Sequence, residues 1–398
     1  MSAGLQPSIA PSDGQTRAPV ILQVLPALDS GGVERGTVDI AAAIARQGWT
    51  ALVASRGGPM VREVLRAGAT HLTLPLKTRN PLWFRRNSNL LVNLMRDHGV
   101  DLVHVRSRAP AWSAVHAARI VGVPLVTTFH GAYSHGSAIK RRYSSVMLRG
   151  ARVIAVSEFI AAHIRETYPR FDTSRMLTIP RGVDFETFDP AAVSGPRIVQ
   201  LSKAWRLADG VRVILMPGRF TRLKGHATVI DALARMSNTD NLCVIFGADE
   251  GRERYRRELE TLVRDLGLAS RVRFAGRQAD MPAAYMLADV VVSASTVPEA
   301  FGRVSAEAQA MGRPVVATAH GASGEIVIPG DTGWLVPPGD ATALAGALDE
   351  ILTLDSWKRE LLAARARRHI AANFRVEGMC DATLAAYREL LQGVAATA

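Results

Sequence analysis

The sequence predicts an α/β protein with two domains of similar size, each built on a parallel sheet that carries helices on both faces. Three observations support this prediction. Short apolar runs alternate with amphipathic segments along nearly the whole chain. The alternation breaks once, at residues 190–204, and then starts again. The chain of 398 residues, 48% of them hydrophobic, is also too long for one ordinary domain and apolar enough for two cores.

Six apolar runs in the first half have the length and composition of buried strands, and the segments between them carry apolar residues at helical spacing. The expected helices include residues 34–46, 81–98 and 111–121. The expected strands are residues 20–27, 51–55, 71–76, 101–106, 124–130 and 152–157. Because strands and helices alternate, neighbouring strands should run parallel.

The second half repeats this order, with a helix or a turn after each strand. The expected strands are residues 211–218, 242–247, 272–276, 289–295, 313–318 and 333–337. From residue 341 the pattern is helical almost to the end, and residues 375–391 form the last expected helix. Two doubly wound, Rossmann-like units in succession predict a cleft between the sheet edges where the strands end.

The chain divides into five segments on this interpretation. Residues 1–18 are rich in Pro, Ser, Gly and Gln and are predicted to be a disordered tail. The first domain spans residues 19–190 and a linker spans residues 191–204. The second domain spans residues 205–374, and a C-terminal helix in residues 375–398 has the length to cross back to the first domain.

The sequence favours a cytoplasmic protein. The first residues lack the charged start and apolar core of a signal peptide, and no run of about 18 apolar residues occurs. The two cysteines, Cys243 and Cys380, fit a reducing compartment and are too few for a cysteine metal site.

The net charge of +12 is concentrated in one half of the chain. Residues 1–200 hold 24 Lys and Arg against 13 Asp and Glu, whereas residues 201–398 hold 24 against 23. A basic half favours nucleic acid, anionic lipid or an anionic substrate, and the alternative is a solvated Arg-rich surface. No ribonucleoprotein, helix-turn-helix or zinc-finger signature is present, so a nucleic-acid partner is not expected.

The segment EAFGRVSAE, residues 299–307, suggests a binding site for a phosphorylated sugar. Glu299, Phe301 and Gly302 fall in the loop after an expected strand, and Glu307 falls inside the next helix. The two carboxylates suit sugar hydroxyls, and the helix N-terminus at Gly302 and Arg303 suits a phosphate. The alternative is an ordinary helix with a solvated Glu307.

The segment PGRFTRLKGH, residues 217–226, follows the first strand of the second domain. Arg219 and Lys224 lie five residues apart across a turn that opens a helix, so both cations could converge on a diphosphate. The segment lacks the spacing of a Walker A loop. The alternative is a pair of exposed loop cations.

These motifs together resemble the retaining glycosyltransferases of family four, which have the GT-B fold. The resemblance covers residues 20–390 and includes GRF-x-x-x-KG, the E-x7-E pattern and PVVAT-x-x-G-x-x-E-I-V. It also includes GGVERG after the first strand, TFHG at residues 128–131, VSE at residues 156–158 and DTGWLVPPGD at residues 331–340. Each motif alone is weak, and the set is specific.

The resemblance implies a role for each matched residue in the second domain. Arg219 and Lys224 would neutralise the diphosphate of a nucleotide-sugar donor. Glu307 would bind the ribose and Glu299 the hydroxyls of the donor sugar. The remaining donor-site residues would act mainly through backbone groups: Phe301, Gly302 and Arg303 at the sugar and phosphate, and Arg277 and Gln278 at the base.

In the first domain, the resemblance implies that Gly31 and Gly32 let a loop approach the diphosphate and that His130 lies close to the donor sugar. The chain departs from the family at Arg181, where many relatives have Asn in Asn-Gly-Val-Asp. The family places that turn at the domain junction, so the departure puts local detail in doubt and leaves the chemistry in place.

The implied reaction moves a sugar from a UDP- or GDP-linked donor to a glycan or lipid-linked acceptor with retention of configuration, as in lipopolysaccharide or exopolysaccharide biosynthesis. Arg219, Lys224 and the helix N-terminus would serve without a metal ion, and no cofactor is expected beyond the donor as co-substrate. The alternatives are a non-catalytic sugar-nucleotide-binding protein and a dehydrogenase, although no G-x-G-x-x-G follows the first strand of either half.

The basic first domain also predicts a location on the inner face of the cytoplasmic membrane. Trp83 and Phe84 precede the pair Arg85–Arg86, and Tyr143 follows the cations at residues 140–142. Aromatic side chains beside cations suit a lipid headgroup interface, so an anionic membrane surface is an expected partner.

Overall fold

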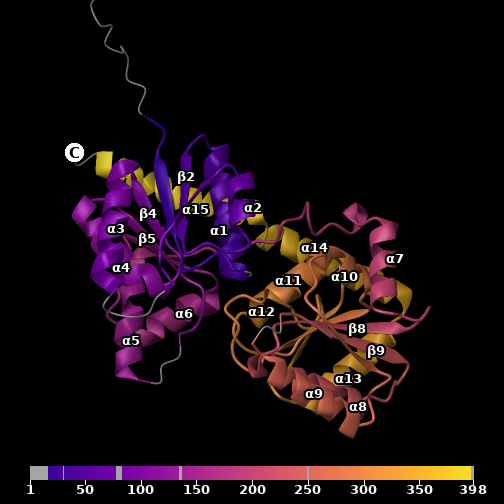
Figure 1. Cartoon of the computed structure of the whole chain (residues 1–398). Coiled ribbons are helices and arrows are strands. Elements are labelled where there is room, and N and C mark those ends of the chain that lie inside the picture. Colours follow the sequence, from indigo (N-terminus) through magenta and orange to yellow (C-terminus); the bar gives the residue numbers. More distant parts are fainter. Residues whose placement is uncertain (1–16, 30, 78–82, 134–136, 249–250, 396–398) are drawn as a thin grey trace, which may run out of the picture.

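The computed structural model describes residues 17–29, 31–77, 83–133, 137–248 and 251–395, and residues 1–16 of the predicted tail lie outside this range. Two α/β domains lie side by side, and the C-terminal helix returns to the first of them (Figure 1). Each domain contains one parallel sheet whose strands alternate with helices along the chain. The predicted fold class is therefore confirmed.

The sheet of the N-terminal domain has seven parallel strands in the order β3-β2-β1-β4-β5-β6-β7. The strands are β1 Val20–Val24, β2 Thr50–Ser55, β3 Thr70–Thr73, β4 Leu102–Val105, β5 Leu125–Phe129, β6 Arg152–Ala155 and β7 Met176–Thr178. The sequence did not predict β7, since its three residues are only half-buried and too few to make a periodic signal. The strand order reverses between β1 and β4, where ligands of doubly wound sheets bind.

The sheet of the C-terminal domain has six strands, all parallel, in the order β10-β9-β8-β11-β12-β13. The strands are β8 Arg212–Pro217, β9 Asn241–Phe246, β10 Val272–Ala275, β11 Val290–Ser293, β12 Val315–Thr318 and β13 Trp334–Val336. All six match the expected runs to within a few residues. The reversal lies between β8 and β11.

Helices cover both faces of the two sheets. The N-terminal domain contains α1 Gly32–Arg46, α2 Val61–Arg66, α3 Trp83–Asp97, α4 Arg108–Val121, α5 Ala138–Ser144 and α6 Glu158–Thr167, with 3-10 turns η1 Ser145–Arg149 and η2 Thr173–Arg175. The rest of the chain contains α7 Gly195–Ala204, α8 His226–Arg235, α9 Glu253–Asp265, α10 Met281–Leu287, α11 Arg303–Ala310, α12 Ser323–Ile326, α13 Ala341–Leu352, α14 Ser356–Asn373 and α15 Val376–Ala395, with 3-10 turns η3 Pro190–Ala192 and η4 Arg222–Lys224.

The segment expected as a linker holds the helix α7. Pro196 stands in its first turn, where the missing N–H costs nothing. Leu201 and the following Trp205 are buried in the core of the C-terminal domain, and α7 packs on α10. Residues 195–204 are thus part of that domain's packing.

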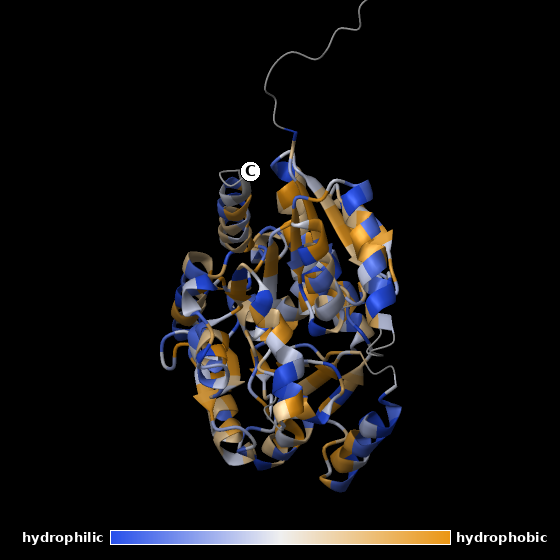
Figure 2. Ribbon diagram, turned by 90° about the vertical axis from the view of Figure 1, so that its left-hand side faces the viewer, coloured by the Kyte–Doolittle hydropathy of each residue, from blue (hydrophilic) through white to orange (hydrophobic). Residues whose placement is uncertain are grey.

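Each sheet separates two apolar cores, one on each face. The strands are apolar on both sides because helices cover both sides, as the fully buried β1 illustrates. Figure 2 shows the apolar strands inside each domain and polar residues along the outer faces of the helices. No helix within the described ranges is long and apolar enough to cross a membrane.

The C-terminal helix α15 completes the N-terminal domain. It packs on α1 and buries Cys380, Leu384 and Tyr387 in that domain's core. Tyr387 is hydrogen-bonded to Nδ1 of the buried His104 on β4, with 2.5 Å between the two atoms. The chain leaves this domain near Val183 and returns to it after Phe374, and Val183 N donates to Phe374 O over 2.8 Å. The two crossings between the domains therefore lie side by side.

A carboxylate of the C-terminal domain also caps a helix of the N-terminal domain. Both oxygens of Glu325, on α12, accept hydrogen bonds from the first N–H groups of α6, from Glu158 N at 2.9 Å and Phe159 N at 2.7 Å. A negative charge at a helix N-terminus is stabilising. This contact ties the two domains together.

Candidate active site

The candidate site lies where the N-termini of α1 and α11 approach each other. α1 follows β1 of the first sheet, and α11 follows β11 of the second. A Cβ atom added at Gly32, the first residue of α1, would lie 3.1 Å from Cδ of Arg303, the first residue of α11. The two helix N-termini therefore face one space between the domains.

Lys224 and Glu299 form an ion pair on the C-terminal side of this space, with 2.5 Å between Nζ and Oε1. Lys224 ends the turn η4, and Gly225 follows it with φ of 73°. A Cβ at Gly225 would collide with the carbonyl of Ala294, so glycine lets the turn rest on the end of β11. The close approach brings Lys224 to Glu299.

The carboxylate of Glu299 is ionised. Burial raises its pKa, but Lys224 and a hydrogen bond from Ser295 Oγ outweigh the burial and hold the pKa below its ordinary value. Its carbonyl accepts from Ala322 N over 2.9 Å, and a Cβ at Gly321 would collide with its backbone. Glu299 is thus held by its side chain and by its backbone.

Glu307 is buried, with 6% of its surface exposed, so the alternative of a solvated carboxylate is wrong. Arg303 Nη2 and Nε donate to Oε1 over 2.6 and 3.1 Å, and Tyr285 OH donates to Oε2 over 3.0 Å. Arg303 and Glu307 lie four residues apart on one face of α11, where a pair of this kind stabilises a helix. Tyr285 comes from α10, and no motif pointed to it.

Gly302 and Phe301 shape the start of α11. Gly302 has φ of 96°, a conformation that favours glycine, and no side chain caps the helix. The ring of Phe301 is buried against Phe374 with 5.6 Å between centroids. The buried ring therefore anchors the loop that leads into the uncapped N-terminus of α11.

Three other predicted residues lie apart from this network. Arg219 and Arg277 are exposed, and neither side chain forms an ion pair or a hydrogen bond with another described residue. Gln278 donates to Asp280 O over 3.3 Å. The expected convergence of Arg219 and Lys224 on one anion stays a prediction.

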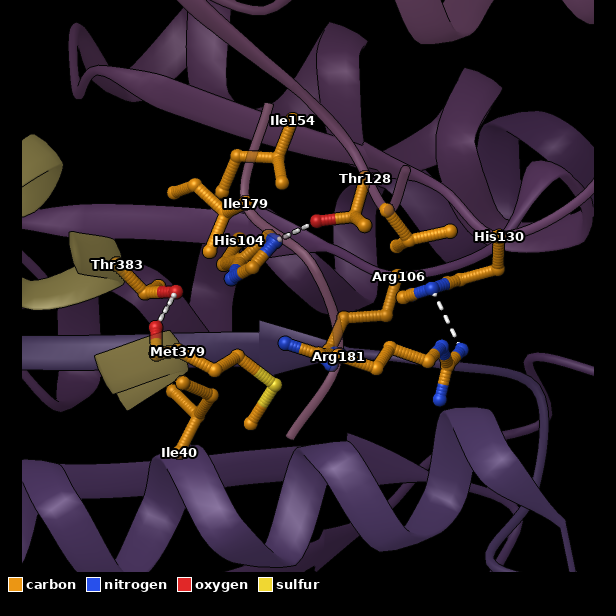
Figure 3. A pocket seen from close by; sticks show the side chains of 11 residues that line it. Ile40, His104, Arg106, Thr128, His130, Ile154, Ile179, Arg181, Met379 and Thr383 are labelled. Carbon is orange, nitrogen blue, oxygen red and sulfur yellow. Dashed lines mark hydrogen bonds between the residues drawn. The ribbon is translucent and has the colours of Figure 1, made fainter. Parts of the chain in front are cut away.

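Gly31, Gly32 and His130 form the opposite side of the space, together with Arg181. Gly31 precedes α1 without a side-chain cap. Arg181 Nη1 donates to Gly32 O, and its Nη2 donates to His130 Nδ1 over 2.8 Å (Figure 3). The family departure at Arg181 thus lies inside the candidate site.

The contact with Arg181 fixes the tautomer of His130. A guanidinium has no acceptor, so Nδ1 accepts and the proton resides on Nε2. Burial, and then the nearby Arg181 and Arg106, hold the pKa of His130 well below its ordinary value. The ring is therefore neutral near pH 7, and its buried Nε2 has no hydrogen-bond partner among the described residues.

His320 is a second residue that the sequence reasoning missed. Its Nε2 donates to Ser295 O over 2.8 Å, and its Nδ1 is buried without a partner among the described residues. It follows β12 beside Glu299. The only signal was its place directly after the strand in PVVATAH, next to Gly321.

Within the described ranges, no group of three or more His, Cys, Asp and Glu side chains is placed to hold a metal ion. Metal independence stays a prediction, and its test is chelation.

Comparisons with known proteins agree with this architecture. A family model described as Glycosyl transferases group 1 matches residues 199–369, and one described as Glycosyltransferase Family 4 matches residues 30–187. The D-inositol 3-phosphate glycosyltransferase of Xylanimonas cellulosilytica is 33% identical over 286 residues, which cover 67% of this chain and 67% of the relative.

Solved structures resemble the whole chain. A glycosyltransferase from Rickettsia africae is 34% identical, with a TM-score of 0.87 and coverage of 94% of this chain and 99% of the neighbour. Anabaena HepE in complex with UDP and glucose is 26% identical, with a TM-score of 0.81 and coverage of 92% and 99%.

Proposed function

The chain belongs to the group 1 glycosyltransferases of family 4, and on that premise we propose that it transfers a hexose from a nucleotide diphosphate sugar with retention of configuration. The donor is UDP-linked or GDP-linked. The Anabaena neighbour was solved with UDP, with UDP-glucose and with UDP and glucose, which favours UDP. The acceptor is a glycan or a lipid-linked sugar.

The ion pair of Lys224 with Glu299 carries the proposal. It places a cation for phosphate and a carboxylate for sugar hydroxyls side by side at the N-terminus of α11. In the structure the two charges satisfy each other. When the donor binds, Lys224 would turn to the diphosphate and Glu299 to the sugar, so neither charge is left buried without a partner.

The reaction needs charge stabilisation where the diphosphate leaves. The bond from the anomeric carbon to the phosphate oxygen breaks, and a bond to the acceptor oxygen forms on the same face. The acceptor proton passes to the departing phosphate oxygen. Lys224, Arg219 and the uncapped N-terminus of α11 at Gly302 would supply positive charge without a metal ion. His130 offers Nε2–H to an oxygen of the bound sugar.

Product analysis tests this proposal. The protein is incubated with UDP- and GDP-hexoses and with glycan and lipid-linked acceptors, and the product is analysed by mass spectrometry and its anomeric configuration by NMR. An α-linked product from an α-linked donor supports retention, and inversion contradicts it. Binding of donors without turnover on any acceptor would favour the alternative of a non-catalytic sugar-nucleotide-binding protein.

We also propose that the N-terminal domain docks on an anionic membrane surface at the inner face of the cytoplasmic membrane, where lipid-linked acceptors of lipopolysaccharide or exopolysaccharide synthesis would be presented. On α3, Arg85 and Arg86 are exposed, and Arg86 stacks over Trp83 with 4.6 Å to the ring centroid. Each surface cation contributes about 1 kcal/mol near anionic lipid.

The short helix α5 adds a second basic segment with an apolar tip. It projects from the N-terminal domain (Figure 1). Its residues 140–142 are exposed cations, Ile139 is 80% exposed and Tyr143 is 37% exposed. An exposed isoleucine beside cations suits insertion among headgroups.

Liposome co-sedimentation at low and high salt tests the docking. Wild type should bind anionic vesicles and not neutral ones, and binding should weaken with salt. Exchange of Arg85, Arg86 and the cations at 140–142 for Gln should remove it. Exchange of Arg254 and Arg257 on α9 of the other domain for Gln is the control matched in charge to exchange of Arg85 and Arg86 alone. Binding unchanged by the first set contradicts the proposal.

A further inference from the structure

Two arginines of the N-terminal domain lie beside α1, one of them buried and the other half-buried. Arg106 follows β4 and is 4% exposed, and Arg181 follows β7. A Cβ at Gly36 would lie 3.0 Å from Arg106 Nη2 and 3.8 Å from Arg181 Nη1, so both guanidinium groups border one point on α1. At Gly32, one turn earlier, a Cβ would meet Arg181 Nη1 at 2.9 Å and Arg303. The spacing of the two glycines leaves room for the arginines.

These two arginines lack ion-pair partners. Within the described part of the chain, no carboxylate lies within 4.0 Å of either guanidinium. Glu34 and Asp39 are the acids that act on Arg181, and they act from beyond that distance. Burial, and then Arg106 and Arg303, lower the pKa of Arg181 to about 9. Burial without a paired acid leaves the charge of Arg106 uncompensated, which favours binding of an anion beside the two guanidinium groups.

Among the described residues, the buried side-chain nitrogens near the two arginines that lack a hydrogen-bond partner are both donors. Arg106 Nε and His130 Nε2 are buried, carry protons and have no partner among the described residues. Arg106 Nη1 reaches only the neutral Gln23 Oε1, at 3.4 Å. These side chains, with Thr128, line a cavity of about 20 Å³, which admits one oxygen atom of a larger group that lies outside it (Figure 3). A ligand that fits is rich in acceptors and negatively charged.

We propose that Arg106 and Arg181 bind a compact oxyanion, a carboxylate or a phosphate, that a substrate carries in addition to the donor diphosphate. The planar forks of two arginines match such groups. The diphosphate has its own cations in the other domain, at Arg219 and Lys224. The inference rests on the proposed transferase function, because the oxyanion belongs either to the transferred sugar, as in a uronic acid, or to a phosphorylated acceptor.

Inorganic phosphate is the direct probe. Thermal unfolding and calorimetric titration are run with UDP saturating, in phosphate and in chloride at equal ionic strength. Phosphate should raise the Tm of the wild type. In Arg181→Asn, which introduces the residue common among relatives, the dissociation constant of phosphate should rise at least tenfold. Arg313→Asn is the control, since Arg313 is a partly buried arginine of the other domain without an ion pair among the described residues.

Two further arms identify the source of the oxyanion. One compares UDP-glucuronate with UDP-glucose, and the other compares glucose 6-phosphate with glucose in the presence of UDP. A preference for the anionic member that Arg181→Asn abolishes and Arg313→Asn keeps assigns the source. No phosphate effect in the wild type, or an effect that survives Arg181→Asn, overturns the inference. Failure of the wild type to bind UDP would instead refute the proposed function.

Discussion

Replacing Lys224 with Ala removes one charge from the candidate donor site. In the structure Lys224 Nζ lies 2.5 Å from Glu299, and the two side chains are 29% and 18% exposed. A preorganised cation at a leaving group contributes about 2–4 kcal/mol to the transition state. At 1.36 kcal/mol for each factor of ten, kcat/KM should fall about 30- to 1,000-fold.

The same change also affects stability, and the two effects can be separated. Glu299 keeps its bond from Ser295 and loses its charged partner. Loss of a charge-assisted bond costs about 1–3 kcal/mol, so Tm should fall by a few degrees with the fold intact. If Lys224 served only to hold Glu299, its replacement would cost no further activity in a Glu299→Ala background.

Arg222→Ala is the matched control. Arg222 lies on the same turn, its side chain is 72% exposed, and it pairs with Glu258 on the surface. Such pairs contribute about 0–1 kcal/mol, so kcat/KM should stay within about twofold of wild type. Initial rates over a range of donor concentrations, with circular dichroism of each variant, make the measurement. Near-normal kcat/KM in Lys224→Ala would refute the assignment of the diphosphate site.

Four further predictions concern the same protein. Arg219→Ala should lower kcat/KM by a similar factor, and normal kinetics in that variant would place the exposed Arg219 outside the site. Glu307→Ala should mainly raise the donor KM, because a ribose contact is made in ground and transition states alike; a KM equal to wild type contradicts the ribose role. Turnover should survive saturating EDTA, whereas loss restored by Mg²⁺ or Mn²⁺ would reveal a metal ion. Asp39→Asn should stabilise the fold at pH 7.5. Burial raises the pKa of Asp39 from 3.8 to about 6, so the stability that its neutral form contributes is present below pH 3.8 and is lost as pH rises through 6. At pH 7.5 the buried side chain is charged, whereas Asn stays neutral. The gain, at most about 3 kcal/mol, should shrink as pH falls toward 4 in thermal unfolding, and a gain that does not change with pH would contradict it.

Much of the fold could be predicted because its signals are local. A strand covered on both faces must be apolar throughout, so β1 and β9 stand out as continuous runs. The short β7 and the helix α7 were missed, since β7 has three half-buried residues and α7 begins in a segment rich in Pro, Ser and Gly. Both elements form because they pack against neighbouring elements, β7 beside β6 and α7 on α10.

The candidate site was predicted in part for the same reason. A loop and the start of a helix lie between Glu299 and Glu307. One short stretch of sequence therefore brings both carboxylates to one edge of a sheet. Their partners were not predictable. Tyr285 reaches Glu307 from another helix, and His320 reaches Ser295 from another strand.

The sequence by itself determined two parallel sheets and the succession of their strands and helices, and it predicted the residues of a site for a phosphorylated sugar, because periodicity and spacing act along the chain. Only the tertiary structure decided what meets across the cleft. Arg181 contacts His130 and Gly32, which lie 51 and 149 residues away. Glu325 caps a helix 166 residues earlier in the chain. Such contacts depend on how two domains are oriented and on which charges burial leaves without partners, and no pattern along one strand or helix encodes either.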